Sequence, residues 1–188
     1  MNKSIELIDE REACDKVAAI YKDIRKCFQI DFVPNFFKIQ AGRPDLLEST
    51  WVAAKTILIN GVLPRTLKEM IFTAISKENK CEYCESAHLA FCTILGVDSV
   101  TKENLLEDIH AIKPARNRDI ILFAIKVATR PPQVEQVDYD QIRGLGINEQ
   151  ELQEIIAMAS FATFANMLAD GFKVPIDSEF HDILGSAQ

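Results

Sequence analysis

The chain has 188 residues, of which 48% are hydrophobic and 26% are charged, a composition typical of a globular protein with one domain and a substantial core. Its formal net charge of −7 argues against binding to nucleic acids or to anionic membranes. The first residues lack the basic and apolar regions of a signal peptide, and no apolar run is long enough to span a membrane. Because the five cysteines are an odd number, we expect a cytoplasmic protein without a disulfide scaffold.

The first 60 residues are predicted to be helical. Apolar residues at helical spacing indicate a first helix over residues 9–28, which Asp9 can cap. We expect Cys14 and Cys27 to be packing residues on this helix, because neither has a cysteine or histidine neighbour.

Two further helices are expected before residue 60. Pro34 opens a short one, whose aromatic residues we place in the core rather than in a ligand pocket. Pro44 suits the first turn of a longer helix that reaches about Leu58 and carries Trp51, which we expect to serve in packing.

The pattern that organises the chain lies in residues 61–110. Pro64 opens a helix that carries Glu69. The polar residues 77–80 are expected to break this helix, with Asn79 as the cap of a second one. Such a break folds Glu69 back beside the start of the second helix.

Cys81, Cys84 and His88 are spaced three and four residues apart, so they share one face of the second helix. Both cysteines fall in its first turn, where the macrodipole and the free N–H groups favour a thiolate. The spacing therefore predicts a reactive thiol with a resolving partner, joined in a reversible Cys81–Cys84 disulfide.

The positions of His88 and Glu69 suggest how the two thiols differ. His88 lies one turn beyond Cys84, so we assign the attack and a lowered pKa to Cys84. An ionised Glu69 would disfavour a thiolate, and its expected role is to accept the thiol proton directly or through water.

Two other interpretations of these residues stay open. Cysteine is among the most buried residue types, so both thiols could be inert core residues, as we expect of Cys92. Cys81, Cys84, His88 and Glu69 could also bind zinc, although no second Cys-x-x-Cys or His-x3-His pair completes such a site.

Residues 111–188 are predicted to continue the helical pattern. Pro114 opens an apolar helix, and Asp138 is expected to cap a short one. Asn148 with Glu151 resembles a capping box, and the long apolar helix after it is expected to be central or at a subunit contact.

Two features of the C-terminal part are less defined. The tail after Pro175 carries apolar residues on one side and is expected to dock on a neighbouring subunit. Residues 67–71 resemble residues 152–156 at an offset of 85, which would place Asn166 opposite Cys81 in a degenerate second copy. Chance explains a match of this length equally well.

The sequence contains no strand-like alternation, phosphate-binding glycine loop, dinucleotide fingerprint or Ser-His-Asp order. We therefore predict an all-α, single-domain protein. Its parts are N-terminal helices in residues 1–60, a redox-motif core in residues 61–110, and C-terminal helices and a tail in residues 111–188.

The complete pattern, Glu69-x11-Cys81-x2-Cys84-x3-His88, resembles the signature of the alkylhydroperoxidase D (AhpD)-like branch of the carboxymuconolactone decarboxylase superfamily. Over most of the chain the similarity is to its peroxidase-related subgroup. Some AhpD proteins carry a histidine directly before the second cysteine, and Tyr83 stands there in this chain. The proton-relay role of that histidine is therefore not carried over.

The resemblance implies an AhpD-like helical bundle and a thiol-dependent peroxidase or related disulfide oxidoreductase in antioxidant defence. Cys84 would attack the peroxide, Cys81 would condense with the resulting sulfenic acid, and Glu69 and His88 would move protons. The resemblance further implies no bound cofactor, an external dithiol or lipoyl-type protein as reductant, and a homotrimer or homohexamer.

Two other functions remain open. The superfamily includes a carboxymuconolactone decarboxylase, but that branch does not use a cysteine pair. A non-enzymatic redox-sensing or binding module is the other alternative, and turnover with peroxide and a dithiol would distinguish it from an enzyme.

Overall fold

The computed structural model describes residues 5–186, and every regular element in that range is helical. The α-helices are α1 (Asp15–Phe28), α2 (Asn35–Lys38), α3 (Pro44–Ala54), α4 (Arg65–Glu78), α5 (Glu82–Ile94), α6 (Ser99–Glu107), α7 (Ala115–Thr129), α8 (Gln136–Gly144), α9 (Glu149–Phe172) and α10 (Ser178–Gly185). The α3 helix continues as a π-helical turn, η1 (Lys55–Ile59), and η2 (Ile109–Ala111) and η3 (Pro131–Gln133) are 3-10 turns. The predicted all-α class is confirmed.

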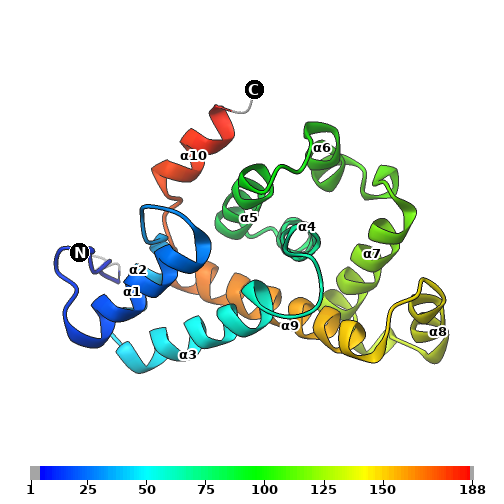
Figure 1. The fold of residues 1–188 in the computed structure, drawn as a ribbon, viewed down its shortest axis with the longest axis horizontal. Coiled ribbons are helices and arrows are strands. Elements are labelled where there is room, and N and C mark those ends of the chain that lie inside the picture. The colour runs from blue at the N-terminus through cyan, green and yellow to red at the C-terminus, as the bar shows by residue number, and fades with distance from the viewer. Residues whose placement is uncertain (1–4, 187–188) are drawn as a thin grey trace.

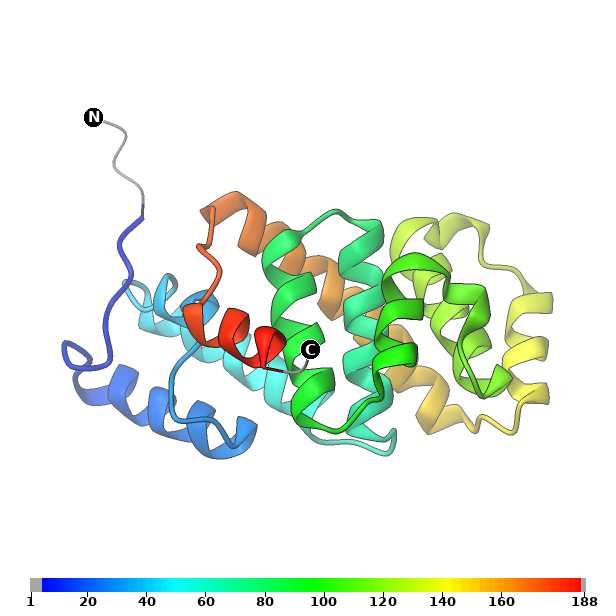
Figure 2. The same ribbon diagram turned by 90° about the horizontal axis from the view of Figure 1, so that it is seen from above.

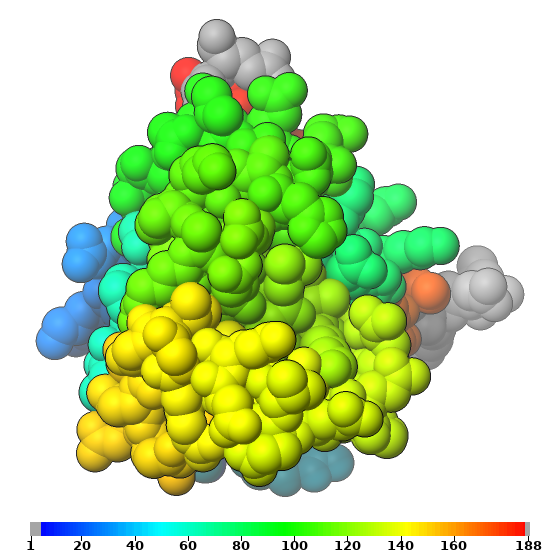
Figure 3. Space-filling view, turned by 90° about the vertical axis from the view of Figure 1, so that its right-hand side faces the viewer, coloured from blue at the N-terminus to red at the C-terminus, as the bar shows by residue number. Residues whose placement is uncertain are grey.

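The α4 helix lies at the centre of the bundle, with α5, α7 and α9 packed against it (Figure 1). Every residue from Leu67 to Ser76 is buried, so α4 has no solvent-exposed face over this stretch. The polar residues of this stretch must therefore find partners inside the protein. At one end of the molecule, residues of α6, α7 and α8 form the surface over this core (Figure 3).

The α9 helix crosses behind α4 and α5 through much of the length of the bundle (Figure 2). A capping box of Asn148 and Glu151 starts it, as predicted. By length and composition α9 could also cross a membrane, but its buried face packs against α4, α5 and α7, as expected of a core helix. Phe164 and Met167 are exposed on its other face, and the predicted oligomer, which light scattering would test, stays a prediction.

Three predicted helix starts are wrong. The α1 helix begins at Asp15 rather than near Asp9, because the backbone is extended at Cys14 and left-handed at Asp15. The N-cap of α5 is Cys81, since α4 continues to Glu78 and leaves Asn79 in the connection. The α8 helix begins two residues before Asp138, which instead completes a capping box with Glu135.

The N-terminal helices contribute an aromatic layer. Trp51 packs edge-on against Phe28 and Phe37, and its indole N–H donates to Asp23 at 2.9 Å, so its predicted packing role is confirmed. The packing role predicted for Cys14 is wrong, because that residue is exposed, while Cys27 is half-buried.

The C-terminal helix α10 docks on its own chain. Phe180 is fully buried and packs edge-on against Phe32 and Phe91. The expectation that the apolar side of the tail docks on a neighbouring subunit is therefore wrong for Phe180. The consequence is that α10 covers α5 close to the predicted thiol motif (Figure 1).

A buried ion pair fixes the loop before α4. The fully buried ammonium of Lys68 donates to the carbonyls of Ile57 and Asn60 and forms an ion pair with Glu154 of α9. The same carboxylate accepts a hydrogen bond from the Val62 N–H at 2.7 Å. Gly61 is needed in this loop, because its φ is +112° and a Cβ there would clash with the Glu154 carboxylate.

Candidate active site

The two motif thiols lie at the start of α5, where the chain turns from α4. The left-handed backbone of Lys80 and a hydrogen bond from the Cys81 N–H to the Ser76 carbonyl, at 2.9 Å, shape this turn. Cys81 and Cys84 are both free and buried, with 0% and 3% of their surface exposed. The Cys81 thiol points at the main-chain carbonyl of Asn166 in α9, 3.8 Å away.

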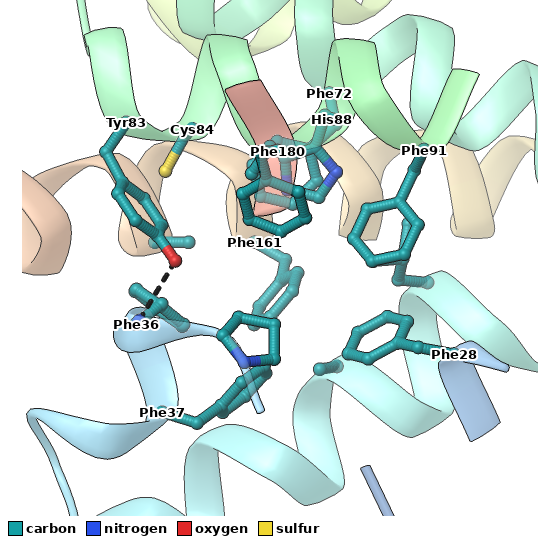
Figure 4. Close-up of a pocket in the computed structure, with 15 residues that line it drawn as sticks. Phe28, Phe36, Phe37, Phe72, Tyr83, Cys84, His88, Phe91, Phe161 and Phe180 are labelled. Atoms are coloured by element: carbon teal, nitrogen blue, oxygen red, sulfur yellow. Dashed lines mark hydrogen bonds between the residues drawn. The ribbon is translucent and has the colours of Figure 1, made fainter. Parts of the chain in front are cut away.

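A small cavity of about 40 Å³ opens beside Cys84 but not beside Cys81. The Cys84 sulfur points into it from α5, and His88 also lines it (Figure 4). Most of the remaining wall is aromatic and comes from Phe28, Phe36, Phe37, Phe72, Tyr83, Phe91, Phe161 and Phe180. The cavity therefore distinguishes the two thiols, because only Cys84 can meet a ligand there. The aromatic residues of α2 were expected in the core rather than in a ligand pocket. Phe36 and Phe37 are buried in the core and also line this cavity, so that expectation is incomplete.

Glu69 and His88 meet inside the protein, because α4 folds back on α5 as predicted, but the partner of Glu69 is His88 rather than a thiol. The His88 Nδ1–H donates to Glu69 Oε2 at 2.5 Å. The imidazole ring also stacks on Phe72, with 3.5 Å between ring centroids. These two contacts fix the orientation of the ring. Because Nδ1 is bound to Glu69, Nε2 is the ring nitrogen that can exchange a proton with another group.

Arg65 is a site residue that the sequence analysis missed. Its Nε donates to Glu69 Oε1 at 2.6 Å, and its guanidinium lies over the rings of Phe28 and Phe91. Burial alone would raise the pKa of Glu69, but His88 and Arg65 outweigh it, so this pKa is lowered and the carboxylate stays ionised. The i, i+4 spacing of Arg65 and Glu69 was the available signal.

The predicted lowering of the Cys84 pKa is wrong for this arrangement. A hydrogen bond with the Cys81 thiol, followed by burial, raises the pKa of Cys84 well above its usual value. His88 does not offset these effects, because its Nδ1 is bound to Glu69. Cys84 is therefore a protonated thiol at neutral pH, and its reaction requires a proton acceptor.

Tyr83 occupies the position at which some relatives carry histidine, and it joins three segments. Its hydroxyl donates to Asp177 Oδ2 at 2.8 Å and accepts from the Phe36 N–H at 3.0 Å. The other Asp177 oxygen accepts from the Asn35 N–H at 2.9 Å. Tyr83 thus holds α2 and the start of α10 against α5, and no local signal could have indicated a contact across 94 residues.

The buried Asp177 should give stability a pH dependence. Burial raises its pKa from 3.8 to about 6, so between these values the native protein binds more protons than the unfolded chain. This contribution, up to about 3 kcal/mol, should be complete below about pH 4 and lost as the pH rises through about 6. Urea unfolding of wild type and Asp177→Asn from pH 4 to 7 should show this loss in wild type only.

The exposed Asp182 on α10 supplies the matched control, since Asp182→Asn should keep the wild-type pH dependence. Equal slopes for wild type and Asp177→Asn would contradict the assignment to Asp177.

The part of the chain that the structure describes contains no group of three or more His, Cys, Asp or Glu residues placed to hold a metal ion. Glu69 and His88 are bound to each other rather than directed with the thiols at a common point. These contacts give no support to the alternative of a zinc site.

A family model described as the carboxymuconolactone decarboxylase family matches residues 44–111, which include the complete thiol motif. No curated protein matches the chain.

Several solved structures share the fold. One is an AhpD core, an uncharacterized peroxidase-related protein from Ralstonia eutropha JMP134, with 24% identity, a TM-score of 0.86, and coverage of 94% of this chain and 93% of that one. Another is an uncharacterized peroxidase-related protein from Silicibacter sp. TM1040, with 23% identity, a TM-score of 0.83, and coverage of 96% and 95%.

The debrominase Bmp8 has the same fold, with 19% identity, a TM-score of 0.82, and coverage of 100% of both chains. A variant of Bmp8 in complex with 2,3,4-tribromopyrrole gives a TM-score of 0.83. Identities at this level show a shared fold and no more. Residues 44–111 thus match the model of the carboxymuconolactone decarboxylase family, and the chain as a whole has the AhpD-like helical fold.

Proposed function

We propose that this protein is a thiol-dependent peroxidase in which Cys84 attacks the peroxide and Cys81 resolves the product. The observation that carries the proposal is the asymmetry of the pair. Cys84 faces the aromatic cavity together with His88, whereas Cys81 lies outside the cavity lining and its thiol points at the main-chain carbonyl of Asn166.

The chemistry needs only these two thiols and an external reductant. The Cys84 sulfur attacks one peroxide oxygen, the O–O bond breaks, and the other oxygen leaves as an alcohol, so that Cys84 becomes a sulfenic acid. The Cys81 thiol then attacks the sulfenic sulfur and releases water, which forms the disulfide. An external dithiol, of the lipoyl type, restores both thiols and is itself oxidised to a disulfide.

The proton path follows from the contacts of Glu69. One of its oxygens is bound by Arg65 and the other by His88, so Glu69 acts through His88 and does not take the thiol proton directly. His88 Nε2 accepts the Cys84 proton as the sulfur attacks and returns it to the leaving oxygen. The ionised Glu69 stabilises the imidazolium between these steps.

The cavity lining favours an apolar organic hydroperoxide over hydrogen peroxide. Aromatic side chains offer little hydrogen bonding to a small polar molecule, but they favour the burial of a hydrocarbon group. Because a volume of about 40 Å³ holds little more than water, such a substrate requires the aromatic wall to move outward.

A second candidate is reductive removal of a halogen from an aromatic ring. The aromatic lining beside a single thiol favours it, as does the shared fold with a debrominase that has been solved with 2,3,4-tribromopyrrole. An aryl bromide and the two thiols would give the dehalogenated ring, hydrogen bromide and the same disulfide. Release of bromide would identify this reaction.

The experiment incubates the reduced protein with an alkyl hydroperoxide and then maps its thiols by mass spectrometry. We expect a Cys81–Cys84 disulfide, and dihydrolipoamide should restore both thiols and sustain peroxide consumption. Cys92 is the internal control and should stay a free thiol, because it does not line the cavity and its sulfur faces the Thr73 hydroxyl. A protein that leaves Cys81 and Cys84 unlinked and consumes no peroxide would contradict the proposed function.

A further inference from the structure

The α10 helix contributes one part of the cavity wall, and a single buried side chain attaches it to the bundle. Of the residues Ser178–Gly185, Phe180 alone is buried, and its ring is one of the aromatic rings that line the cavity (Figure 4). The ring packs edge-on against Phe32 and Phe91, with ring centroids 5.3 and 5.7 Å apart. The side-chain hydrogen bonds that the structure describes for residues 178–186 stay within that segment. The helix is therefore held mainly by the apolar contacts of one ring.

The chain just before α10 is attached much more firmly. The Asp177 carboxylate accepts hydrogen bonds from the Tyr83 hydroxyl at 2.8 Å and from the Asn35 N–H at 2.9 Å. The side-chain amide of Asn35 also donates to the Pro175 carbonyl at 3.1 Å. These bonds tie the start of α10 to α2 and α5. A rotation of α10 about Asp177 would break the contacts of Phe180 and leave the bonds before it intact.

The other parts of the wall belong to helices that cannot move so easily. Phe72 lies on the central helix α4, and Phe161 lies on α9, which packs against α4, α5 and α7. Displacing either ring would disturb the close packing of the core. The α10 helix, in contrast, packs mainly against α5 and lies on the outside of the bundle (Figure 1). Its part of the wall is the one that opens with the smallest loss of buried contacts.

We propose that α10 is the gate of the cavity. It rotates outward about Asp177, the ring of Phe180 leaves the wall, and the organic group of the substrate occupies the vacated space near Cys84. That space fits an apolar group about the size of a phenyl ring, so the favoured substrates are hydroperoxides that carry an aromatic or branched hydrocarbon group. The inference rests on the proposed function for the identity of the substrate. The opening itself is a property of the free protein and can be measured without a peroxide.

The test is the rate at which N-phenylmaleimide alkylates Cys84 at one fixed pH, followed on the Cys84 peptide by mass spectrometry. In Phe180→Ala the gate loses its anchor, and the rate should rise by about tenfold or more. The matched control is Phe161→Ala, which removes an equal ring from the same cavity but from a helix fixed in the core. Its rate should stay close to that of wild type.

Cys92 distinguishes local opening from unfolding of the whole protein, because it is buried and does not line the cavity. It should stay unmodified in both variants. Should alkylation of Cys92 show that an alanine variant unfolds, Phe180→Leu and Phe161→Leu keep apolar side chains and are compared in their place, with the same order of rates expected.

Two results would overturn the proposal. Equal acceleration by the changes at Phe180 and Phe161 would show that the volume of the cavity, and not the position of α10, limits access to Cys84. A Cys84 rate that neither change at Phe180 increases would place the entrance elsewhere. A protein in which the changes at Phe180 speed alkylation as expected, but which never consumes peroxide, would count against the proposed function alone.

Discussion

Replacing Cys84 by serine is expected to lower the rate of peroxide consumption by about 10³-fold or more, because a hydroxyl cannot supply the attacking sulfur. Replacing Cys92 by serine is the matched control and should leave the rate close to that of wild type. Both residues are buried on α5, but the Cys92 sulfur faces the Thr73 hydroxyl at 3.8 Å, and burial raises its pKa to about 12. Initial rates with an alkyl hydroperoxide and dihydrolipoamide measure the difference.

The reciprocal change identifies the resolving thiol. Cys81→Ser should still form a sulfenic acid at Cys84, because only Cys84 lines the cavity, and a dimedone-type reagent should label it there. The trap would instead label Cys81 in the Cys84→Ser protein if the two roles were exchanged. A Cys84→Ser protein that consumes peroxide at the wild-type rate would remove Cys84 from the chemistry altogether.

The largest expected effect on stability is that of Lys68→Met, which should reduce the free energy of unfolding by about 3–5 kcal/mol. The change leaves the Glu154 carboxylate buried without its cation and removes the donor to the carbonyls of Ile57 and Asn60. Urea unfolding measures the loss. The control is Lys16→Met, since Lys16 and Glu48 form an exposed pair, and such pairs contribute about 0–1 kcal/mol.

The double variant Lys68→Met with Glu154→Leu should recover part of the loss, because no unpaired charge remains in the interior. Recovery should be incomplete, since Glu154 also accepts the N–H groups of Val62 and Leu63. A Lys68→Met protein as stable as Lys16→Met would show that the buried pair contributes no more than an exposed one.

The sequence by itself determined the helical class and the motif's place at a helix start. Apolar spacing, the prolines at the starts of α3, α4 and α7, and the capping box at Asn148 act within one or two turns, so they can be read locally. The placement of Cys81 and Cys84 at the start of α5 was predicted for the same reason. The pairing of Glu69 with His88 was not predicted, since the sequence analysis placed Glu69 beside the thiols. Prediction of helix starts from local sequence failed where several neighbouring polar residues could cap a helix, as at Asp9 and Asn79.

The tertiary structure alone decided how the two thiols differ. Asn166 and Asp177 reach the motif from 85 and 94 residues away, and only the packing of α9 and α10 against α5 brings them there. The raised pKa of Cys84 also comes from packing, because the neighbouring Cys81 thiol and burial raise it. Capping and helical spacing depend on neighbours in the chain, whereas burial and charge depend on which distant segments pack together.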